Sequence, residues 1–376
     1  MRSLINGVLS LALFASSSAA FADDRGSEVV TSQHSFSLTK IAGNLENPWG
    51  LDWLPSGQII VTERPGRLTL ISTDGRTKIP VRGLPKITSE FRDGLLDVAV
   101  SPNFISDQTI FFTYSQKEGD NRWLEIASAR LSDSTLQDVK VIFSSGVKVQ
   151  KDQGFGSRIR FDDQGYMVIS IGDHAVAANA QDPMNPLGSV IRIGQDGSPA
   201  VQYPSDDMAP AIFAYGFKNP QGLAIDPRDG TIWATDHGGK GGAELNRVET
   251  GANYGWPTRT FSGGDTPRAT VEGDFVDPVF TWGAAPTIAL SGLEIYTGGD
   301  FPSWEGDLFA GSLKQEALIR MMLDDAGSVI GTEYVIYEDI GRIREVKQGP
   351  DGRLYILNDD PEGGIYRIDP ISRVPS

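Results

Sequence analysis

The 376-residue sequence contains no cysteine, only three histidines, and fewer basic than acidic residues, 33 against 49. Without cysteine the chain forms neither a disulfide framework nor a thiolate site, so a packed core must hold it together. The formal net charge of −16 argues against nucleic acid as a partner, because nucleic-acid binding needs a basic face. Beyond the N-terminal segment no apolar run is long enough to span a bilayer, so we expect a protein that does not cross a membrane.

The N-terminal segment has the pattern of a secretory signal peptide. A basic residue, Arg2, precedes an apolar run over residues 4–14, and residues 20–22 read Ala-Phe-Ala. This order of charged, apolar and small residues is typical of a signal that is removed on export. We therefore expect cleavage of residues 1–22, a periplasmic location, and one domain over residues 23–376.

Glycine and proline, 43 and 22 residues, punctuate short runs rich in β-forming residues. Sustained amphipathic segments with a helical period are absent, so the chain is predicted to be nearly all β. A weak repeat recurs six times at intervals of 46 to 76 residues: a turn with Gly or Asp, a short apolar strand, a polar loop, and often a second strand. The six copies are Pro55–Ile71, Ser106–Gln116, Asp162–Asp173, Arg228–Gly238, Trp304–Met321 and Pro350–Ile368.

Units of this size cannot bury both faces of a small sheet alone, so they are expected to pack against one another in a ring. The sequence therefore predicts an all-β fold, a six-bladed β-propeller around a central channel. A strand at residues 36–41 would pair with the last blade and close the ring. The alternative architecture is a pair of β-sandwiches.

The stretch Tyr215–Pro257 combines the features expected of a ligand site. Lys218 and Asn219 lie at a turn, a glycine-rich loop follows at residues 237–242, and Glu244 and Tyr254 come after it. Glycine permits close backbone approach, and free carbonyls, a carboxylate and a phenol are oxygen ligands of the kind that Ca²⁺ takes. The alternative is an ordinary strand–loop–strand unit with a tight turn.

Several further cations lie beside glycine in predicted loops. Lys314 ends a predicted strand, and Arg342 and Arg344 alternate, so both point to the same side of their strand. Together with Lys218 they suggest an anionic ligand, since guanidinium groups pair with carboxylates in a bidentate manner. The alternative is that each cation pairs with a nearby acid such as Glu345.

The segments GFKNPQGLAID, HGGKGGAELN, ANYGWP, SGLEIYTGGDFPSWEGDLFAGSLK and GRIREVKQGPDGRLYILND carry a resemblance to a known family. They are similar to the soluble pyrroloquinoline-quinone (PQQ) sugar dehydrogenases of the glucose/sorbosone dehydrogenase family, in particular to the aldose sugar dehydrogenases. The resemblance extends from Leu45 to Ile368. It implies a six-bladed propeller that oxidises the C1 hydroxyl of aldoses to lactones with PQQ and Ca²⁺, and passes the electrons to a periplasmic acceptor.

The resemblance also implies roles for residues of this chain. Lys218 takes the place of a family arginine, Gly239 that of a proline, and Ala243 that of an aspartate, which weakens a second calcium site. The implied PQQ-binding residues are Lys218, Asn219, Lys314, Arg342 and Arg344, and the implied calcium ligands are the Gly238 and Gly239 carbonyls, with Glu244 and Tyr254 at the second site.

One departure concerns the general base. The family has a histidine where this chain has Gly154, nineteen residues before the aspartate that orients it, here Asp173. A positioned base contributes about 10²–10⁴-fold to such a reaction, and glycine cannot supply it. The candidates to replace it are His174, Asp152 and Asp173 itself. Lys218 is expected to take part in catalysis beside the base. The alternatives for the whole protein are a PQQ- or sugar-binding propeller with impaired turnover and a Ca²⁺-dependent lactone hydrolase.

Overall fold

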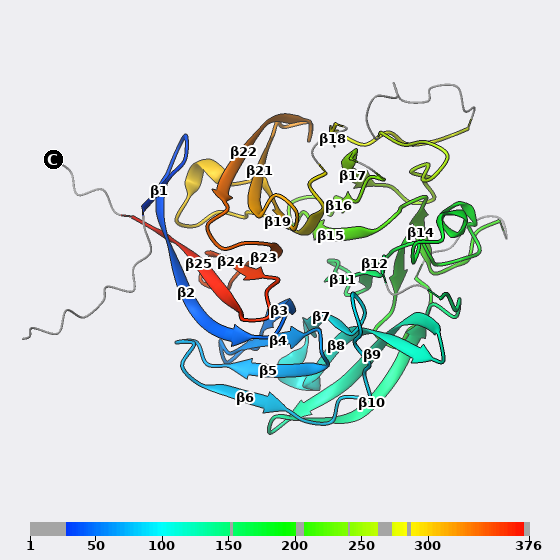
Figure 1. Ribbon diagram of the computed structural model, residues 1–376, viewed down its shortest axis with the longest axis horizontal. Helices are drawn as coiled ribbons and strands as arrows, with labels where there is room; N and C mark the ends of the chain where they lie inside the picture. The colour runs from blue at the N-terminus through cyan, green and yellow to red at the C-terminus, as the bar shows by residue number, and fades with distance from the viewer. Residues whose placement is uncertain are drawn as a thin grey trace, which may run out of the picture.

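The computed structural model describes residues 28–150, 153–200, 207–239, 241–261, 273–283 and 287–371. The expected signal peptide, residues 1–22, and the candidate base Asp152 lie outside these ranges. The described chain forms six antiparallel sheets arranged around a central axis (Figure 1), which confirms the predicted six-bladed β-propeller. Within these ranges no helix has the length and apolarity needed to cross a bilayer.

Each blade is a sheet whose strands follow one another from the channel to the rim. The first is β3 (Pro48–Trp53), β4 (Ile59–Glu63), β5 (Arg67–Ile71) and β6 (Lys78–Val81). The second is β7 (Leu95–Val100), β8 (Thr109–Glu118), β9 (Asn121–Ser132) and β10 (Thr135–Ser144). The third is β11 (Gly156–Phe161), β12 (Met167–Ile171), β13 (Ser189–Ile193) and β14 (Ile212–Tyr215). The fourth is β15 (Pro220–Ile225), β16 (Ile232–Asp236), β17 (Ala243–Val248) and β18 (Phe280–Trp282).

The fifth blade is β19 (Leu290–Ile295), β20 (Leu308–Ser312), β21 (Ala317–Leu323) and β22 (Val329–Tyr337). The sixth has five strands, β23 (Ile343–Gln348), β24 (Leu354–Asn358), β25 (Gly363–Pro370), β2 (Ser35–Leu45) and β1 (Glu28–Val30). The helices of the described chain are one turn or little more: α1 (Phe104–Asp107), η1 (Ala177–Gln181) and η2 (Pro302–Trp304).

The ring is closed by strands from both ends of the chain. β2 pairs antiparallel with β25, with Phe36 opposite Pro370 and Leu45 opposite Gly363. Blue and red ribbons therefore lie side by side in Figure 1. This confirms the predicted pairing of a strand at residues 36–41 with the last blade, and it leaves no open seam between the first and last blades.

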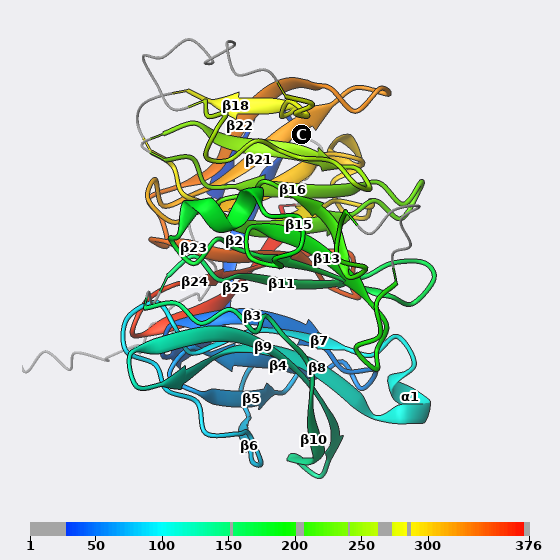
Figure 2. The ribbon, with the colours of Figure 1, turned by 90° about the vertical axis from the view of Figure 1, so that its right-hand side faces the viewer.

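The second strand of most blades is buried by packing against the neighbouring blades. The second strands of the first, third, fourth, fifth and sixth blades are buried at every residue, because neighbouring blades cover both of their faces. The side view shows these sheets stacked upon one another (Figure 2). Each of the six sequence copies contains the second strand of one blade, so the repeat reflected this double burial.

Candidate functional site

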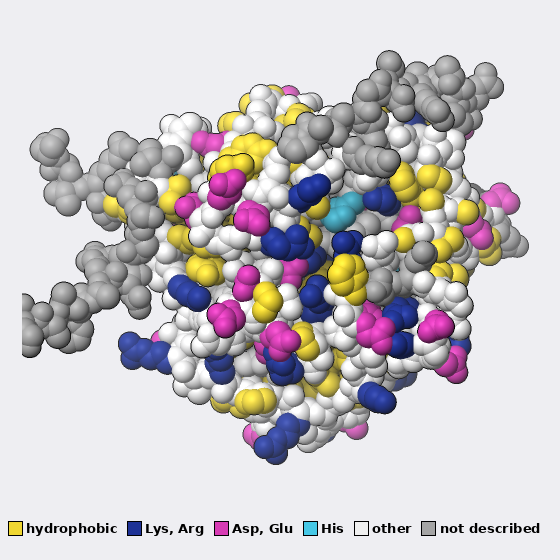
Figure 3. All heavy atoms as spheres, viewed as in Figure 1, with side chains coloured by type: hydrophobic (Ala, Val, Ile, Leu, Met, Phe, Trp, Pro, Cys, Tyr) yellow, Lys and Arg dark blue, Asp and Glu magenta, His cyan; other side chains and the backbone are white. Residues whose placement is uncertain are grey.

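One end of the channel gathers charged side chains. There the inner strands begin, and the second strands of neighbouring blades end. We call this end the channel mouth and define it by Asp173, Lys218, Asn219, Asp236, Arg342, Arg344 and Asp359. Figure 3 views this face, and Lys and Arg side chains lie close together near its centre.

Arg342 and Arg344 lie at the start of β23 and point to the same side, as predicted. Arg344 is buried and donates to Asp359 Oδ2 at 2.5 Å and to Gln221 Oε1 at 2.7 Å. Arg342 is 45% exposed and donates to the Leu313 carbonyl at 2.9 Å and to Asp359 Oδ2 at 3.3 Å. Two guanidinium groups therefore share one carboxylate oxygen.

A third guanidinium adds to this surplus. Arg64 Nη1 lies 4.0 Å from Asp359 Oδ1. The three arginines hold the pKa of the Asp359 carboxyl far below its usual range, although burial alone would raise it. The Arg344 Nε atom is buried and has no hydrogen-bond partner among the described residues. Three cations facing one anion, one of them with an unused donor, form a site with spare capacity for an anionic ligand.

Lys314 lies at the turn between β20 and β21 and is exposed. Its backbone N–H donates to the Ile288 carbonyl at 3.2 Å, which fixes the turn. Arg342 donates to the carbonyl of the preceding residue, Leu313, so the two cations belong to one corner of the mouth. That they serve one ligand stays a prediction.

The Lys218–Asn219 turn is held by a buried carboxylate. The backbone N–H groups of Lys218 and Asn219 donate to the two oxygens of Asp236, at 2.8 and 2.7 Å. Asn219 Oδ1 accepts from the Gly156 N–H at 3.0 Å, which joins the third and fourth blades. The pKa of Asp236 is raised to about 6, mainly by burial, and the nearby Asp173 raises it further.

Lys218 also reaches the glycine-rich loop. Its Nζ donates to the Gly238 carbonyl at 2.8 Å and lies 5.4 Å from the centre of the Trp256 ring. A Cβ atom at Gly238 would lie 1.7 Å from the Gly241 carbonyl oxygen, so only glycine fits there. Gly239 is exposed. The Gly238 carbonyl thus faces the mouth, and in this structure the lysine is its partner.

Asp173 follows β12 and is almost fully buried at the mouth. Its Oδ1 accepts from the Ala175 N–H at 2.7 Å and its Oδ2 from the Trp256 indole N–H at 2.9 Å. Burial raises the pKa of Asp173, and the charge of Lys218 opposes that rise. The carboxylate is therefore held in one orientation and shifted toward the pKa range of a general base.

His174, the next residue, points elsewhere. Its side chain is fully buried, with its ring 4.5 Å from the Phe155 ring centre. Burial lowers the pKa of His174 to about 3, and neither ring nitrogen has a hydrogen-bond partner among the described residues. The structure thus gives no support to the prediction of His174 as the base, because neighbouring residues of the chain point in different directions.

Gly154 lies beside the Asp173 carboxylate. A Cβ atom built on Gly154 would lie 3.3 Å from Asp173 Oδ1 and 3.2 Å from the Ala175 nitrogen, and the Gly154 φ is +77°. A side chain at this position would begin next to Asp173, as the resemblance implies for the family histidine. Here the left-handed backbone and the close neighbours favour glycine.

The side chains of Glu244 and Tyr254 do not meet at one site. Tyr254 is buried against Phe217, and its hydroxyl donates to the Arg247 carbonyl and accepts from the Glu249 N–H at 2.9 Å. Arg247 lies three residues beyond Glu244 along β17, or about 10 Å in a strand. The phenol is thus occupied in the core, and the structure does not support it as a calcium ligand.

Glu244 instead faces another carboxylate. It lies directly opposite Asp236 across the β16–β17 pair. Burial, followed by the charges of Asp236 and Asp277, raises the pKa of Glu244 to about 8. The described residues contain no group of three or more His, Asp or Glu side chains arranged to hold a metal. A cation site here would therefore rely on this carboxylate pair and backbone carbonyls.

A second ionic network fills the channel beneath the mouth, and sequence reasoning missed it. Arg158 is fully buried and pairs with Glu345 and with Asp97, the latter at 3.4 Å. Arg160 lies 3.4 Å from Glu345 and 3.6 Å from Asp97. Two guanidinium groups thus face two carboxylates. The alternation of arginines on β11 matches that on β23 and was a usable signal for this pairing.

A family model described as Glucose / Sorbosone dehydrogenase matches residues 45–367. The chain is 34% identical to the aldose sugar dehydrogenase YliI of Escherichia coli (strain K12), over 87% of this chain and 91% of that protein. It belongs to the glucose/sorbosone dehydrogenase family.

Two further similarities agree with this assignment. The chain is 24% identical to quinoprotein glucose dehydrogenase B of Acinetobacter calcoaceticus, over 89% of this chain and 87% of that protein. The crystal structure of the soluble aldose sugar dehydrogenase from Escherichia coli, in its apo-form, superimposes with a TM-score of 0.82 at 30% identity, covering 89% of this chain and all of that one.

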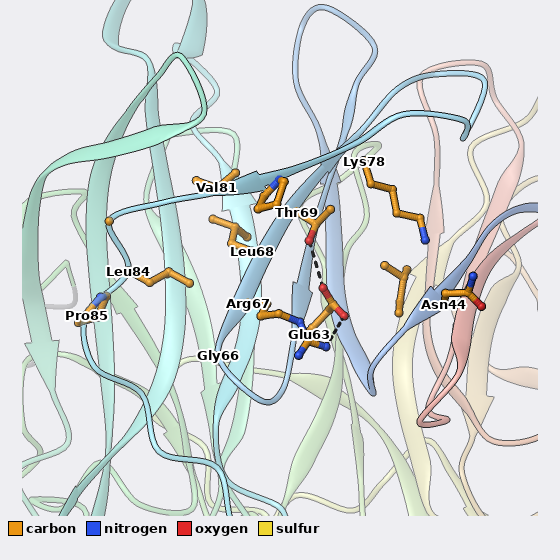
Figure 4. Close-up of a pocket in the computed structure, with 13 residues that line it drawn as sticks. Asn44, Glu63, Gly66, Arg67, Leu68, Thr69, Lys78, Val81, Leu84 and Pro85 are labelled. Atoms are coloured by element: carbon orange, nitrogen blue, oxygen red, sulfur yellow. Dashed lines mark hydrogen bonds and ion pairs between the residues drawn. The ribbon is translucent and has the colours of Figure 1, made fainter.

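In this member of the glucose/sorbosone dehydrogenase family, a cavity of about 600 Å³ lies between the first blade and the end of β2 in the sixth blade (Figure 4). Glu63 is buried there and accepts from Arg67 at 2.8 Å and from Thr69 at 3.0 Å. None of the lining residues belongs to the channel mouth. The Glu63 carboxylate already has hydrogen-bond partners on its own blade. The size of this cavity therefore does not identify it as a catalytic site.

Proposed function

We propose that this chain binds PQQ and Ca²⁺ at the channel mouth and oxidises the C1 hydroxyl of an aldose or related polyol to a lactone. The electrons would pass to a periplasmic acceptor after export of the protein. The observation that carries the proposal is the surplus of three arginines over the single carboxylate of Asp359, with Lys314 beside them. The name of the Acinetobacter relative, a quinoprotein, supports the same cofactor.

The residues at the mouth fit a polycarboxylate cofactor. Arg342 is half-exposed, Arg344 has an unused buried Nε donor, and Lys314 is exposed, so each has capacity for a ligand carboxylate. PQQ, when bound, would supply the two-electron acceptor for the reaction. Lys218 and Asn219, fixed by Asp236, would hold its quinone side, and the Gly238 and Gly239 carbonyls would ligate Ca²⁺.

Oxidation at C1 removes two electrons with the C1 hydrogen and one proton from the hydroxyl group. We assign the proton to Asp173. Its carboxylate is held by the Ala175 N–H at Oδ1 and by the Trp256 indole at Oδ2. Glycine at position 154 places no side chain beside Asp173 Oδ1, where a Cβ atom would lie 3.3 Å away. The raised pKa of Asp173 makes it a stronger base than an exposed aspartate.

The test is reconstitution of the purified protein with PQQ and Ca²⁺, followed by a dye-reduction screen over aldoses. We expect sugar-dependent reduction that needs both additions. In Asp173→Asn, kcat should fall by about 10²–10⁴-fold, while PQQ affinity stays unchanged. The matched control is Asp162→Asn, which changes an aspartate of the same blade that pairs with Arg192 away from the mouth.

One observation favours a second candidate function. With Gly154 in place of the family histidine and His174 buried against Phe155, neither position offers an imidazole to Asp173. Saturable PQQ binding without any sugar-dependent reduction would therefore identify the protein as a PQQ- or sugar-binding propeller. Turnover of lactones with Ca²⁺ and without PQQ would identify the hydrolase instead, although the cationic surplus offers it no support.

A further inference from the structure

Two exposed tyrosines stand together at the end of β22, on the fifth blade. Tyr334 is 47% exposed and Tyr337 53% exposed. Their rings are 5.7 Å apart and meet edge to face at 81°. With Gln315 they line a hollow of about 420 Å³. Large aromatic side chains that share an exposed hollow usually mark a place where something binds.

A break in the strand pairing puts the two rings on the same side. Residues three apart in a regular strand point to opposite faces. Here Leu318 pairs with Ile336, and the next residue, Ile319, pairs with Tyr334, so Val335 is an extra residue on β22. Val335 and Ile336 are buried while both tyrosines are exposed. Such bulges re-aim side chains and are common next to binding sites.

Polar groups surround the rings. The Tyr334 hydroxyl donates to Gln315 Oε1 at 2.6 Å, and the Tyr337 hydroxyl is hydrogen-bonded to Glu338, which raises the pKa of Tyr337. The Glu338 N–H donates to the Glu316 carbonyl at 2.9 Å, so two acidic residues lie next to each other beside the hollow. The space-filling view shows hydrophobic and acidic side chains side by side near the end of β22 (Figure 3).

This composition selects a ligand class. Acidic neighbours disfavour an anion, and amide and carboxylate groups hydrogen-bond to hydroxyls. Aromatic rings offer flat apolar surface to the C–H faces of a sugar. A hollow of about 420 Å³ suits a small ligand. A stable protein partner would need about 800 Å² on each side, well beyond two tyrosines. The chemistry therefore fits a neutral carbohydrate.

The hollow is close to the channel mouth. Arg342 donates to the Leu313 carbonyl at 2.9 Å, and Gln315 follows Leu313 by two residues, a span of at most about 7 Å. The hollow and the mouth thus share one turn of the fifth blade. A linear sugar chain that leaves the mouth on this side would pass the tyrosines.

We propose that Tyr334, Tyr337 and Gln315 form an outer subsite for a further sugar unit of an oligosaccharide whose reducing end enters the channel mouth. This inference rests on the proposed sugar oxidation. It adds a binding position outside the channel mouth, on the fifth blade, for the next unit of such a sugar.

The experiment compares glucose with the α-1,4- and β-1,4-linked glucose trisaccharides on the PQQ- and Ca²⁺-loaded protein. We expect a lower KM for at least one trisaccharide than for glucose. In Tyr334→Ala/Tyr337→Ala that advantage should be lost through a KM increase of about tenfold, with kcat and the KM for glucose unchanged. Ile330→Ala, on the same strand and 69% exposed, is the control and should change neither.

A second readout does not depend on turnover. Saturation-transfer NMR on the protein without PQQ should show trisaccharide binding that the double variant loses and Ile330→Ala keeps. If no sugar is oxidised but this binding is seen, the subsite stands and the dehydrogenase proposal falls. If glucose and trisaccharides are oxidised alike by all variants, or no trisaccharide binding is seen, the subsite is wrong. Slower reduction of a protein acceptor in the double variant, with dye reduction unchanged, would make the tyrosines an acceptor-docking surface and overturn the inference.

Discussion

Two pairs of alternating arginines line the same channel, and they differ in what they face. Arg158 and Arg160 on β11 meet two carboxylates, Asp97 and Glu345. On β23 the corresponding pair converges on Asp359 alone, which also attracts a third guanidinium. The inner network is balanced in charge, while the cluster at the mouth has an excess of two positive charges.

The difference separates a structural role from a binding role. A buried charge is tolerated when it is paired and hydrogen-bonded, and Arg158 also donates to the carbonyls of Gln221 and Arg344, at 2.9 and 2.7 Å. The charge and the hydrogen-bond donors of Arg158 are thus paired with groups of the protein itself. The Asp359 cluster has unused positive charge, which an anionic ligand would neutralise. Similar sequence patterns thus face different numbers of carboxylates, which is why we propose a structural role for the first pair and ligand binding for the second.

Arg158→Met should give the largest effect, and it should be an effect on stability. The substitution leaves Asp97 and Glu345 with only Arg160 in a buried site, at a cost of about 3–5 kcal/mol. Urea unfolding measures the loss. Adding Glu345→Gln should recover part of it by removing the unpaired charge. If Arg158→Met is as stable as the wild type, the network of Arg158 and Arg160 does not have the structural role assigned to it.

Arg342→Gln should do the reverse. Asp359 keeps Arg344 and Arg64, so we expect little change in the unfolding midpoint. The loss of one charge-assisted contact, about 1.5–3 kcal/mol, should weaken PQQ binding by about 10–100-fold. Fluorescence or absorbance titration with PQQ measures the change. Arg130→Gln is the matched control, since Arg130 is 43% exposed and pairs with Asp138 on an outer strand. If Arg342→Gln and Arg130→Gln bind PQQ with equal affinity, the Asp359 cluster does not differ from the inner network in binding the cofactor.

Lys314→Ala tests the exposed rim of the same cluster. A solvent-accessible lysine gives a weaker contact than a buried guanidinium, so we expect PQQ affinity to fall by about tenfold and stability to stay within about 0.5 kcal/mol. Titration at two salt concentrations should show a smaller salt dependence in the variant. Unchanged PQQ affinity would count against the cofactor assignment at this corner.

Glu244→Gln should have its smallest effect at pH 5, where the wild-type glutamate is already protonated, and should act mainly on the pH dependence of stability. The pKa of Glu244 is raised from its ordinary value of 4.5 to about 8, so between these values the folded state binds more protons than the unfolded state. Stability therefore falls as pH rises through this window, by some fraction of about 1.4 kcal/mol per pH unit. The glutamine variant should show a flatter profile in thermal unfolding between pH 5 and 8.

Calcium sharpens the same measurement. If Glu244 and Asp236 face a cation, Ca²⁺ at pH 8 should raise the unfolding midpoint of the wild type more than that of Glu244→Gln. Glu249→Gln, a change at an exposed residue beyond the end of β17, is the control. An equal response to Ca²⁺ in all three proteins would exclude Glu244 as a ligand.

Much of the fold was predictable, because each blade repeats one physical solution. A second strand covered on both faces is mostly apolar, and the turns around it are rich in glycine and aspartate, so six copies marked six blades. The closing strand at residues 36–41 was predictable because a ring of blades needs a strand that pairs with the last blade. The bulge at Val335 was not, because it depends on the pairing of β21 with β22 rather than on local composition.

The candidate site was predictable only in part. Residue type and alternation indicated that Arg342 and Arg344 share one side of a strand. They did not reveal Asp359, seventeen residues after Arg342, as their common partner. Trp256 gave no sign that its indole would hold Asp173. Tyr254 looked like a ligand in sequence and lies in the core in space.

The sequence by itself determined the blade count, the closed ring, the family and the kinds of charged residue at the mouth, because these depend on patterns within single strands and turns. Only the tertiary structure decided which charges are satisfied and which are in excess. It also decided that His174 faces Phe155 while Asp173 faces the mouth. Such outcomes depend on side chains from different blades meeting at the channel, and no local stretch of sequence encodes that meeting.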